Sequence, residues 1–309
     1  MLRRSLASIF SVALAGCSCP DPEQVTERVS ASDEEVAPFL QADGELEPDA
    51  CMEVCQDEVD FMVESCELVS HDPELTQAWL FECTGLEAVF CTGRRPAGLV
   101  ASGAEVDASA DPVGRWLAEA AHLEAASVPA FVQLAKRLSG LGAPASLVDA
   151  ARSSARDEVE HARVMTAWAR AHGVEPAAVR LRPVGEPGLE ALALENAVEG
   201  CVRETWGALL AWYQAGHAEN PAMRAVLAGI ARDETRHAEL ARSITEWIEP
   251  QLSAAARARV RAARDRAVAE LRQCAGLGLP EPTRRRLGLP GPAEAKVLLD
   301  RVQPMLWAA

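Results

Sequence analysis

The sequence DEVEHARV (residues 157–164) recurs in altered form as DETRHAEL (residues 233–240), and each copy places a Glu three residues before a His. On an α-helix, residues with this spacing are separated by about 60° of rotation and about 4.5 Å of rise, so they share one face. A carboxylate oxygen and an imidazole nitrogen from one helix can therefore bind the same metal ion. The repetition predicts a site built from at least two such helices.

Both copies lie near the middle of stretches in which apolar residues recur every three or four positions, a pattern typical of amphipathic helices. Two further stretches show the same pattern. Asp111 and Asn220 each precede a proline, a combination that favours the start of a helix. The four predicted long helices span residues 112–139, 144–172, 188–217 and 221–249.

The lengths of the connections predict the topology. A short loop joins the first two helices and another joins the last two, so each pair forms an antiparallel hairpin. Residues 173–188, GVEPAAVRLRPVGEPG, separate the hairpins and contain three prolines. Fully extended, they reach about 53 Å, enough to run the length of the helices. We therefore expect an all-α fold, a four-helix bundle with one long crossover.

Each apolar helix face is interrupted near its midpoint by an acid, or by an acid and a His, and no basic residue interrupts these faces. Packing the midpoints together buries several carboxylates in one layer, which is unfavourable unless a cation neutralises them. A hydrogen-bonded core without metal is the alternative. We expect two metal ions, and the predicted ligands are Glu124, Glu158, His161, Glu199, Glu234 and His237.

The third predicted helix offers more than one acid. Glu195 lies one turn before Glu199 on the same face, and Glu204 lies five residues after Glu199. In a regular helix Glu204 points about 140° away from Glu199, but a π-bulge would turn it inward. Glu199 is therefore the first predicted ligand, Glu204 is an additional ligand or an outer residue, and Glu195 ranks third.

Residues 111–250 resemble the ferritin-like di-iron proteins of the rubrerythrin and bacterial multicomponent oxygenase kind, whose helices carry Glu, ExxH, Glu and ExxH in that order. DETRH matches the longer D-E-x-R-H form, and DEVEH matches it except that Glu160 replaces the Arg. The resemblance implies a ferritin-like bundle that binds two iron ions. Manganese is the next alternative for the metal, and zinc comes after it. It also implies that Asp157 and Asp233 orient the His ligands from outside the site.

The expected function is that of an oxidoreductase using O₂ or peroxide, of ferroxidase, peroxide-scavenging or oxygenase type. A non-catalytic scaffold or binding protein with a structural metal site is the alternative. The chain has no CxxC pair for a rubredoxin-like electron carrier, so an oxidoreductase needs a separate, unknown electron donor. Residues 21–90 hold twenty acids and one base, Arg28, in a chain of net charge −16, which argues against nucleic acid as a partner.

The N-terminus has the features of a bacterial lipoprotein signal peptide. Arg3 and Arg4 precede a short apolar run ending in LAGC, which resembles a lipobox, so residues 1–16 are expected to be removed and Cys17 to be acylated. Several acyl chains, palmitate among them, are enough for stable anchoring to a membrane. These features predict the bacterial cell envelope. Because Ser18, which follows the acylated cysteine, is not the acidic residue that retains many lipoproteins in the inner membrane, we favour the outer membrane. An ordinary or a twin-arginine signal peptide is the alternative.

Five cysteines crowd the acidic segment and are candidates for disulfides: Cys51, Cys55, Cys66, Cys83 and Cys91. In an exported chain this density predicts disulfides in a segment with a small core, and a zinc site is the alternative. Since Cys51 and Cys55 lie one helical turn apart, each is expected to pair with a more distant cysteine.

Composition divides the rest of the chain. Residues 17–48 are rich in Pro, Glu, Asp and Ser and are predicted to form a flexible acidic tether. Residues 49–92 are predicted to form a small Cys-rich helical segment, and residues 251–309 a helical C-terminal extension. The acidic segment is interpreted as a solvated surface, with docking to a protein partner as the alternative.

Overall fold

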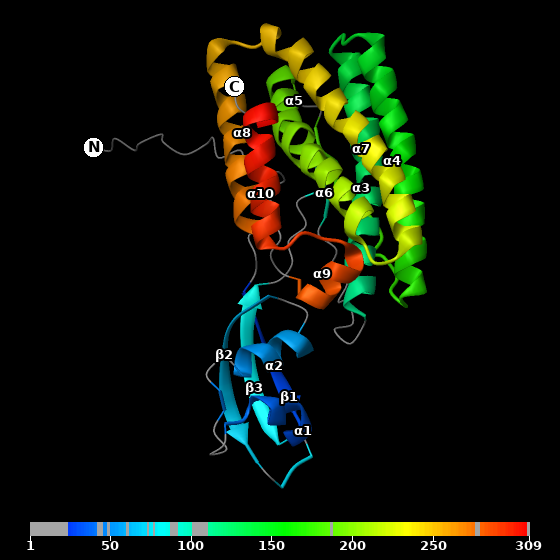
Figure 1. Cartoon of the computed structure of the whole chain (residues 1–309). Coiled ribbons are helices and arrows are strands. Elements are labelled where there is room, and N and C mark those ends of the chain that lie inside the picture. The colour runs from blue at the N-terminus through cyan, green and yellow to red at the C-terminus, as the bar shows by residue number, and fades with distance from the viewer. Residues whose placement is uncertain are drawn as a thin grey trace, which may run out of the picture.

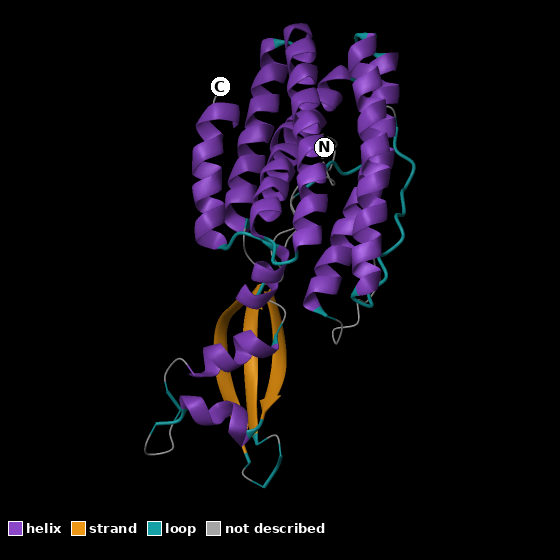
Figure 2. Cartoon of the chain, turned by 45° about the vertical axis from the view of Figure 1, so that its right-hand side comes forward, coloured by secondary structure: helices purple, strands orange, loops and turns teal. Residues whose placement is uncertain are grey.

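The computed structural model describes residues 24–41, 46–47, 50–59, 62–72, 74–76, 78–86, 92–100, 111–185, 188–275 and 279–307. Most of these residues are helical, and a small sheet lies at one end of the long helices (Figure 1, Figure 2). The prediction of an all-α fold is therefore wrong in one part of the chain. The predicted signal peptide (residues 1–16) and Cys17 lie outside the described residues.

Four long helical segments make up the larger part of the structure, and each lies where the sequence predicts a long helix. The third segment is continuous but not regular, because a π-helix, η2, separates two α-helical parts. The segments are α3 (Pro112–Gly140), α4 (Ala145–Ala171), the run of α5 (Leu189–Glu195), η2 (Asn196–Glu204) and α6 (Thr205–His217), and α7 (Pro221–Ile248).

Local sequence sets the starts of two of these helices. The side chain of Asp111 accepts a hydrogen bond from the backbone N–H of Val113, and Pro112 occupies the first turn of α3. The side chain of Asn220 accepts one from the backbone N–H of Ala222 at the start of α7. These bonds satisfy donors that have no partner within the helix.

The long helices pack against one another in pairs. α3 lies against α4, α6 lies against α7, and α7 also contacts α4 and η2. Two apolar cores result, one toward each end of the helices. The first includes Leu117 and Met165, and the second includes Leu134 and Ile244. Between these cores the helices carry a polar layer, which contains the candidate site.

The crossover between α4 and α5 is held by a second loop, residues 92–100. Leu181 forms an antiparallel bridge with Leu99, and the backbone N–H of Arg182 donates to the carbonyl of Gly98 at 2.8 Å. Gly98 has a φ of +83°, and a Cβ there would lie 2.4 Å from the Arg182 carbonyl oxygen, so glycine is required. The loop is thereby fixed against the crossover.

The residues after α7 are helical, as predicted for the C-terminal extension. α8 packs against α5 and η2, and it shares with η2, α6 and α10 an apolar core that includes Val202, Trp206 and Leu271. No helix in the described parts of the chain is both long enough and apolar enough to cross a bilayer. The elements are η3 (Glu249–Gln251), α8 (Ala254–Cys274), α9 (Glu281–Leu287), α10 (Pro292–Val302) and η4 (Gln303–Trp307).

The described residues between 24 and 86 form a separate sheet unit. Its three strands are antiparallel in the order β1-β3-β2, and α2 packs against them. The buried core of the unit includes Val29, Val54 and Phe81. The elements are β1 (Gln24–Ala31), α1 (Asp33–Val36), η1 (Ala37–Phe39), α2 (Ala50–Glu58), β2 (Met62–His71) and β3 (Trp79–Leu86).

The sheet corrects two predictions. β1 lies within the predicted flexible tether (residues 17–48), and β2 and β3 lie within the segment predicted to be helical (residues 49–92). Exposed acids within the strands obscure them in the sequence: in β1, Val29 and Ala31 are buried, whereas Glu27, the preceding residue on the same face, is exposed. β1 pairs with β3, which lies some fifty residues later, and no local pattern reveals such a partner.

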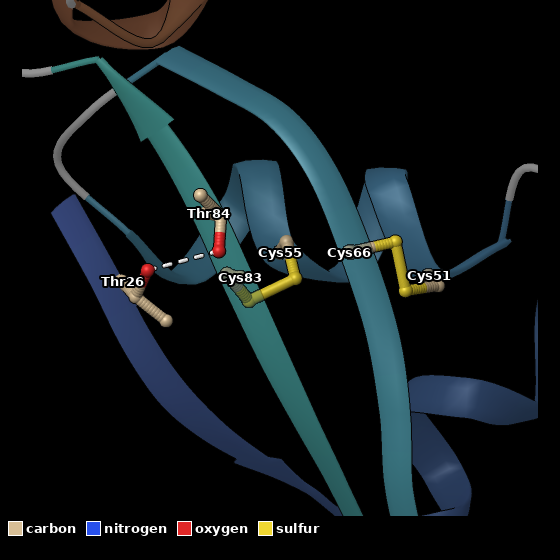
Figure 3. The surroundings of a disulfide bond; sticks show 6 residues. All are labelled: Thr26, Cys51, Cys55, Cys66, Cys83 and Thr84. Carbon is tan, nitrogen blue, oxygen red and sulfur yellow. Dashed lines mark hydrogen bonds between the residues drawn. A yellow bond between two sulfur atoms is a disulfide. The ribbon is translucent and has the colours of Figure 1, made fainter. Parts of the chain in front are cut away.

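Two disulfides join α2 to the sheet (Figure 3). Cys51 on α2 is bonded to Cys66 on β2, and Cys55 is bonded to Cys83 on β3. The expectation that Cys51 and Cys55 pair with more distant cysteines is confirmed. The Cys55–Cys83 bond is buried, whereas Cys51 and Cys66 are partly exposed. The remaining candidate, Cys91, lies outside the described residues.

Replacing Cys55 and Cys83 together by Ser should destabilise the sheet unit by about 3–4 kcal/mol, because the bond closes a loop with a sequence separation of 28. Thermal unfolding of the full chain, followed by near-ultraviolet circular dichroism, measures the effect. Cys201→Ser, which removes a free thiol, is the control and should leave the unfolding of the sheet unit unchanged. Equal midpoints for the double variant and the wild type would contradict this prediction.

Candidate metal centre

A layer of carboxylates and imidazoles lies between the two apolar cores of the long helices. Each of the four helical segments contributes at least one group to it. Glu204, from η2, is fully buried, while Glu124, from α3, keeps 20% of its side chain accessible. In chain order, the layer contains Glu124, Glu158, His161, Glu204, Glu234 and His237.

These side chains form two overlapping groups, each with ligand atoms that all lie within 4.8 Å of one another. The first group contains Glu124, Glu158, His161 and Glu234, and the second contains Glu158, Glu204, Glu234 and His237. Glu158 from α4 and Glu234 from α7 belong to both groups. Two neighbouring metal ions that share carboxylates require such an arrangement.

Each histidine directs one ring nitrogen at the carboxylates. Nδ1 of His161 lies 3.3 Å from Oε1 of Glu234. Nδ1 of His237 lies 3.1 Å from Oε1 of Glu158 and 3.7 Å from Oε2 of Glu204. Both Nδ1 atoms and both carboxylate oxygens of Glu204 are buried without a well-oriented hydrogen bond from any described residue. Buried nitrogen and oxygen donors of this kind fit metal cations.

The opposite ring nitrogens are held by acids of the neighbouring helix. Nε2 of His161 lies 3.0 Å from Oδ2 of Asp233, and Nε2 of His237 lies 3.3 Å from Oδ2 of Asp157. Arg236 donates to both acids, at 2.7 Å to Asp233 and at 3.3 Å to Asp157. The network fixes each ring with Nδ1 directed into the layer, which is what partners outside a metal site do for ligating histidines.

One arginine serves both halves of the repeat. Glu160 stands where the second copy has Arg236, and it lies on the surface, paired with Arg163 at 2.9 Å. Because Arg236 spans from α7 to Asp157 on α4, neither Asp157 nor Asp233 lacks an arginine partner. The outer network is therefore complete despite the substitution at Glu160.

The π-helix η2 determines which acid of the third segment joins the layer. Glu204 belongs to the second group, whereas Glu199, the first predicted ligand, belongs to neither. The Glu199 carboxylate accepts hydrogen bonds from Nη1 of Arg203 at 2.7 Å and from the backbone N–H of Arg95 at 3.1 Å. A π-helix bonds residue i to i+5 and so changes which residues share a face. The structure places Glu204, and not Glu199, in the layer.

Glu195, the third acid considered in this segment, also lies outside the layer. Its carboxylate pairs with Nη1 of Arg94 at 3.3 Å and with Nη1 of Arg137. The side chains of both arginines are nearly inaccessible to solvent. Glu195 therefore has positive partners of its own and is not directed at the metal groups.

Arg94 enters the helices from the loop at residues 92–100, which the pattern of helix faces does not reveal. Its Nη2 donates to Oδ1 of Asn196 at 3.1 Å, and Nδ2 of Asn196 donates to the carbonyl of Ala241 at 2.8 Å. Gly200 makes room, since a Cβ there would lie 2.5 Å from Nη2 of Arg94. A glycine inside the third helix and the GRRP segment before the bundle are the sequence signals for this contact.

Burial and mutual repulsion alter protonation within the layer. Burial, followed by the charges of Glu234 and Glu124, holds the pKa of Glu158 well above its usual value. Burial, followed by the charge of Glu234, raises the pKa of Glu204 to about 7. Burial by itself would lower the pKa of His161, but hydrogen bonds to surrounding carboxylates raise it. The layer therefore retains protons that a bound cation would displace.

A small cavity adjoins the first group. Its volume is about 50 Å³, and Glu124 and Glu234 lie on its polar side. Trp116 and Met165 contribute to its apolar lining, and Gly93, from the loop that carries Arg94, completes part of the wall. The cavity has room for a molecule of only a few atoms.

Comparison with known proteins identified no relative of this chain. A scan of protein-family models, a search of curated proteins and a search of solved structures each found no match to this chain. The chain is mostly helical and contains a buried cluster of carboxylates and histidines that can bind metal ions.

Without metal, the free energy of unfolding should fall as the pH rises from about 5 to 8. The folded-state pKa of Glu204 is about 7, above the ordinary value of 4.5. Its contribution to the free energy of unfolding is therefore complete below about pH 4.5 and is lost as the pH rises through about 7. This contribution is of order 3 kcal/mol. Denaturant unfolding in the presence of a chelator measures it.

Glu204→Gln should reduce this pH dependence by the contribution of Glu204, because the amide does not ionise. The pKa values of Glu158, His161 and His237 are also raised and act in the same direction, so a smaller slope should persist. Glu160→Gln, at an exposed position, is the matched control and should keep the full slope. Wild-type stability that increases over this range would contradict the prediction.

Proposed function

We propose that this chain is a dinuclear metal protein in which residues 111–250 form a ferritin-like four-helix bundle. The observation that carries the proposal is the sharing of Glu158 and Glu234 by two groups of ligand atoms, each with a buried His Nδ1 directed at carboxylates. Two helix hairpins joined by a long crossover support the same architecture.

The two groups assign ligands to two ions. Glu124, Glu158, His161 and Glu234 would hold one ion, and Glu158, Glu204, Glu234 and His237 the other. Mixed oxygen and nitrogen donors suit iron, with manganese and zinc as alternatives. A pair of iron ions, when bound, supplies electrons to a small oxidant. Asp157 and Asp233 keep the imidazoles oriented, and the apolar cores shield the layer from water at both ends of the helices.

The cavity beside Glu124 and Glu234 supports a small oxidant as the substrate. Its volume of about 50 Å³ is far below the roughly 300–1,000 Å³ of sites for larger organic ligands. O₂ or peroxide would fit it, and an organic substrate would not. We therefore favour ferroxidase or peroxide-scavenging activity, with an external electron donor, over an oxygenase.

The N-terminal sequence extends the proposal to the cell envelope. Removal of residues 1–16 and acylation of Cys17 would anchor the protein to a bacterial membrane, with the outer membrane favoured. The alternative function is a membrane-anchored scaffold with a structural metal site. Arg236 favours it, because it bridges α4 and α7 through Asp157 and Asp233 and so gives the network around the site a structural role.

Glu204→Ala should lower the iron content of purified protein from about two ions per chain to about one, because the second group loses a ligand. Glu199→Ala, in the same π-helix, is the matched comparison. It should keep both ions but lower the thermal stability, since Arg203 loses a buried partner. Elemental analysis of anaerobically loaded protein counts the ions, and consumption of peroxide or O₂ gives the activity.

Two results would overturn this assignment. Loss of an ion in Glu199→Ala, with both ions kept in Glu204→Ala, would exchange the roles of the two acids. Wild-type protein that binds no ions would exclude the dinuclear site. Loaded wild-type protein that consumes neither oxidant would leave the site in place and favour the scaffold.

Gly207→Ala tests whether the small cavity receives the oxidant. A Cβ at Gly207 would lie 3.7 Å from Oε2 of Glu234 and 3.7 Å from the backbone nitrogen of Gly93, so a methyl group fits without a clash but narrows the cavity. Oxidant turnover should fall several-fold with the ion content unchanged. Gly216→Ala, in the same helix with no atom within 4 Å of the added Cβ, should leave turnover unchanged. Equal turnover in both variants would exclude this cavity as the oxidant site.

A further inference from the structure

A second and larger cavity contains none of the residues of the metal layer. Its volume is about 620 Å³, within the roughly 300–1,000 Å³ of small-molecule sites. The lining comes from the third helical segment, α7 and α8, with Leu306 of η4 at its edge. Nothing in the proposed oxidoreductase function makes use of this cavity.

Between residues 193 and 208, every residue of the third helical segment that lines the cavity has a small side chain. These residues recur every three or four positions, one or two per turn, so they form one face of the segment. Because these side chains are small, they leave open a volume that larger apolar side chains would fill. They are Ala193, Ala197, Cys201, Thr205 and Ala208.

The cavity is elongated and opens to water. Its lining on α7 begins at Thr235 and ends at Ile248, a span of about 20 Å along the helix. Trp212 and Leu306 line it as well, with 48% and 53% of their surfaces exposed. A single alkyl chain would cover this long apolar surface and remove it from water.

α8 gives the cavity a positive side. Arg257, Arg261 and Arg264 lie on one face of this helix, and all three line the cavity. Arg257 donates to the carbonyl of Leu252 at 2.7 Å. Arg261 is exposed and pairs with no acid in the described parts of the chain. Its guanidinium is available to an anionic group of a ligand.

α7 contributes charges of both signs. Arg242 and Glu246 form an ion pair at 2.7 Å and so balance each other. Glu239 on α7 and Glu249 on η3 are the other acids that line the cavity. Four arginines and three glutamates line the cavity, and three of the arginines lie on α8, where Arg264 also pairs with Asp265 at 3.6 Å. The positive charge that remains on α8 favours an anionic head group there over a cationic one.

We propose that this cavity binds a long-chain fatty acid. The alkyl chain lies along the small residues of the third helical segment, and the carboxylate lies at Arg261 on α8. This binding site is separate from the metal layer, and it stands or falls independently of the proposed oxidoreductase activity.

The test is calorimetric titration of the purified full-length chain with dodecanoate below its micelle concentration. Wild-type protein should bind dodecanoate saturably, and dodecyltrimethylammonium, with the same chain and the opposite charge, should bind more weakly. Arg261→Glu should weaken dodecanoate binding roughly fivefold, because an attraction becomes a repulsion. Arg266→Glu, exposed on the same helix and outside the cavity lining, is the matched control and should bind as the wild type does.

Ala208→Leu should abolish saturable binding by filling the cavity, with circular dichroism as the check on folding. If this variant does not fold, Trp212→Gln, at a half-exposed position, should weaken binding several-fold. The proposal is overturned if dodecanoate does not bind saturably, or if Arg261→Glu and Arg266→Glu bind it equally. It is also overturned if the cationic amphiphile binds as tightly as dodecanoate.

Discussion

Carboxylates buried between apolar cores require positive charge nearby, and much of this structure is arranged around that requirement. An ionised carboxylate in a medium of low polarity is highly unfavourable unless it is paired or bound to a cation. The third helical segment meets the requirement in two ways. Glu195 and Glu199 have arginine partners, whereas Glu204 faces a histidine and two further carboxylates. Only the second environment has uncompensated donors of the kind that a metal site uses.

Residues outside the repeated hairpins complete the surroundings of the site. The loop at residues 92–100 supplies Arg94, holds the crossover through Gly98 and lines the small cavity through Gly93. α8 covers η2 from the other side. The π-helix therefore contacts the metal layer, the loop and α8, and these contacts hold it in place.

The sheet unit is stabilised by different means. Its core is small, and α2 is tied to two strands by covalent bonds, as is typical of units that bury little apolar surface. The long helices carry no disulfide among their described residues, and two apolar cores hold them together. The sequence shows the same difference between the two parts. Cysteines are dense in the acidic segment, whereas apolar residues recur periodically in the later residues.

The sequence by itself determined the long helices, because caps, prolines and apolar periodicity act over a few residues. It also determined that both ExxH motifs meet in one layer, since helical repeat fixes which side chains share a face. Tertiary structure decided that Glu204 and not Glu199 enters that layer, because η2 packs among distant parts of the chain, among them Arg94, whose loop lies about a hundred residues earlier. Strand pairing in the sheet unit was decided in the same way. Its partners lie far apart in the chain, and only the folded protein brings them together.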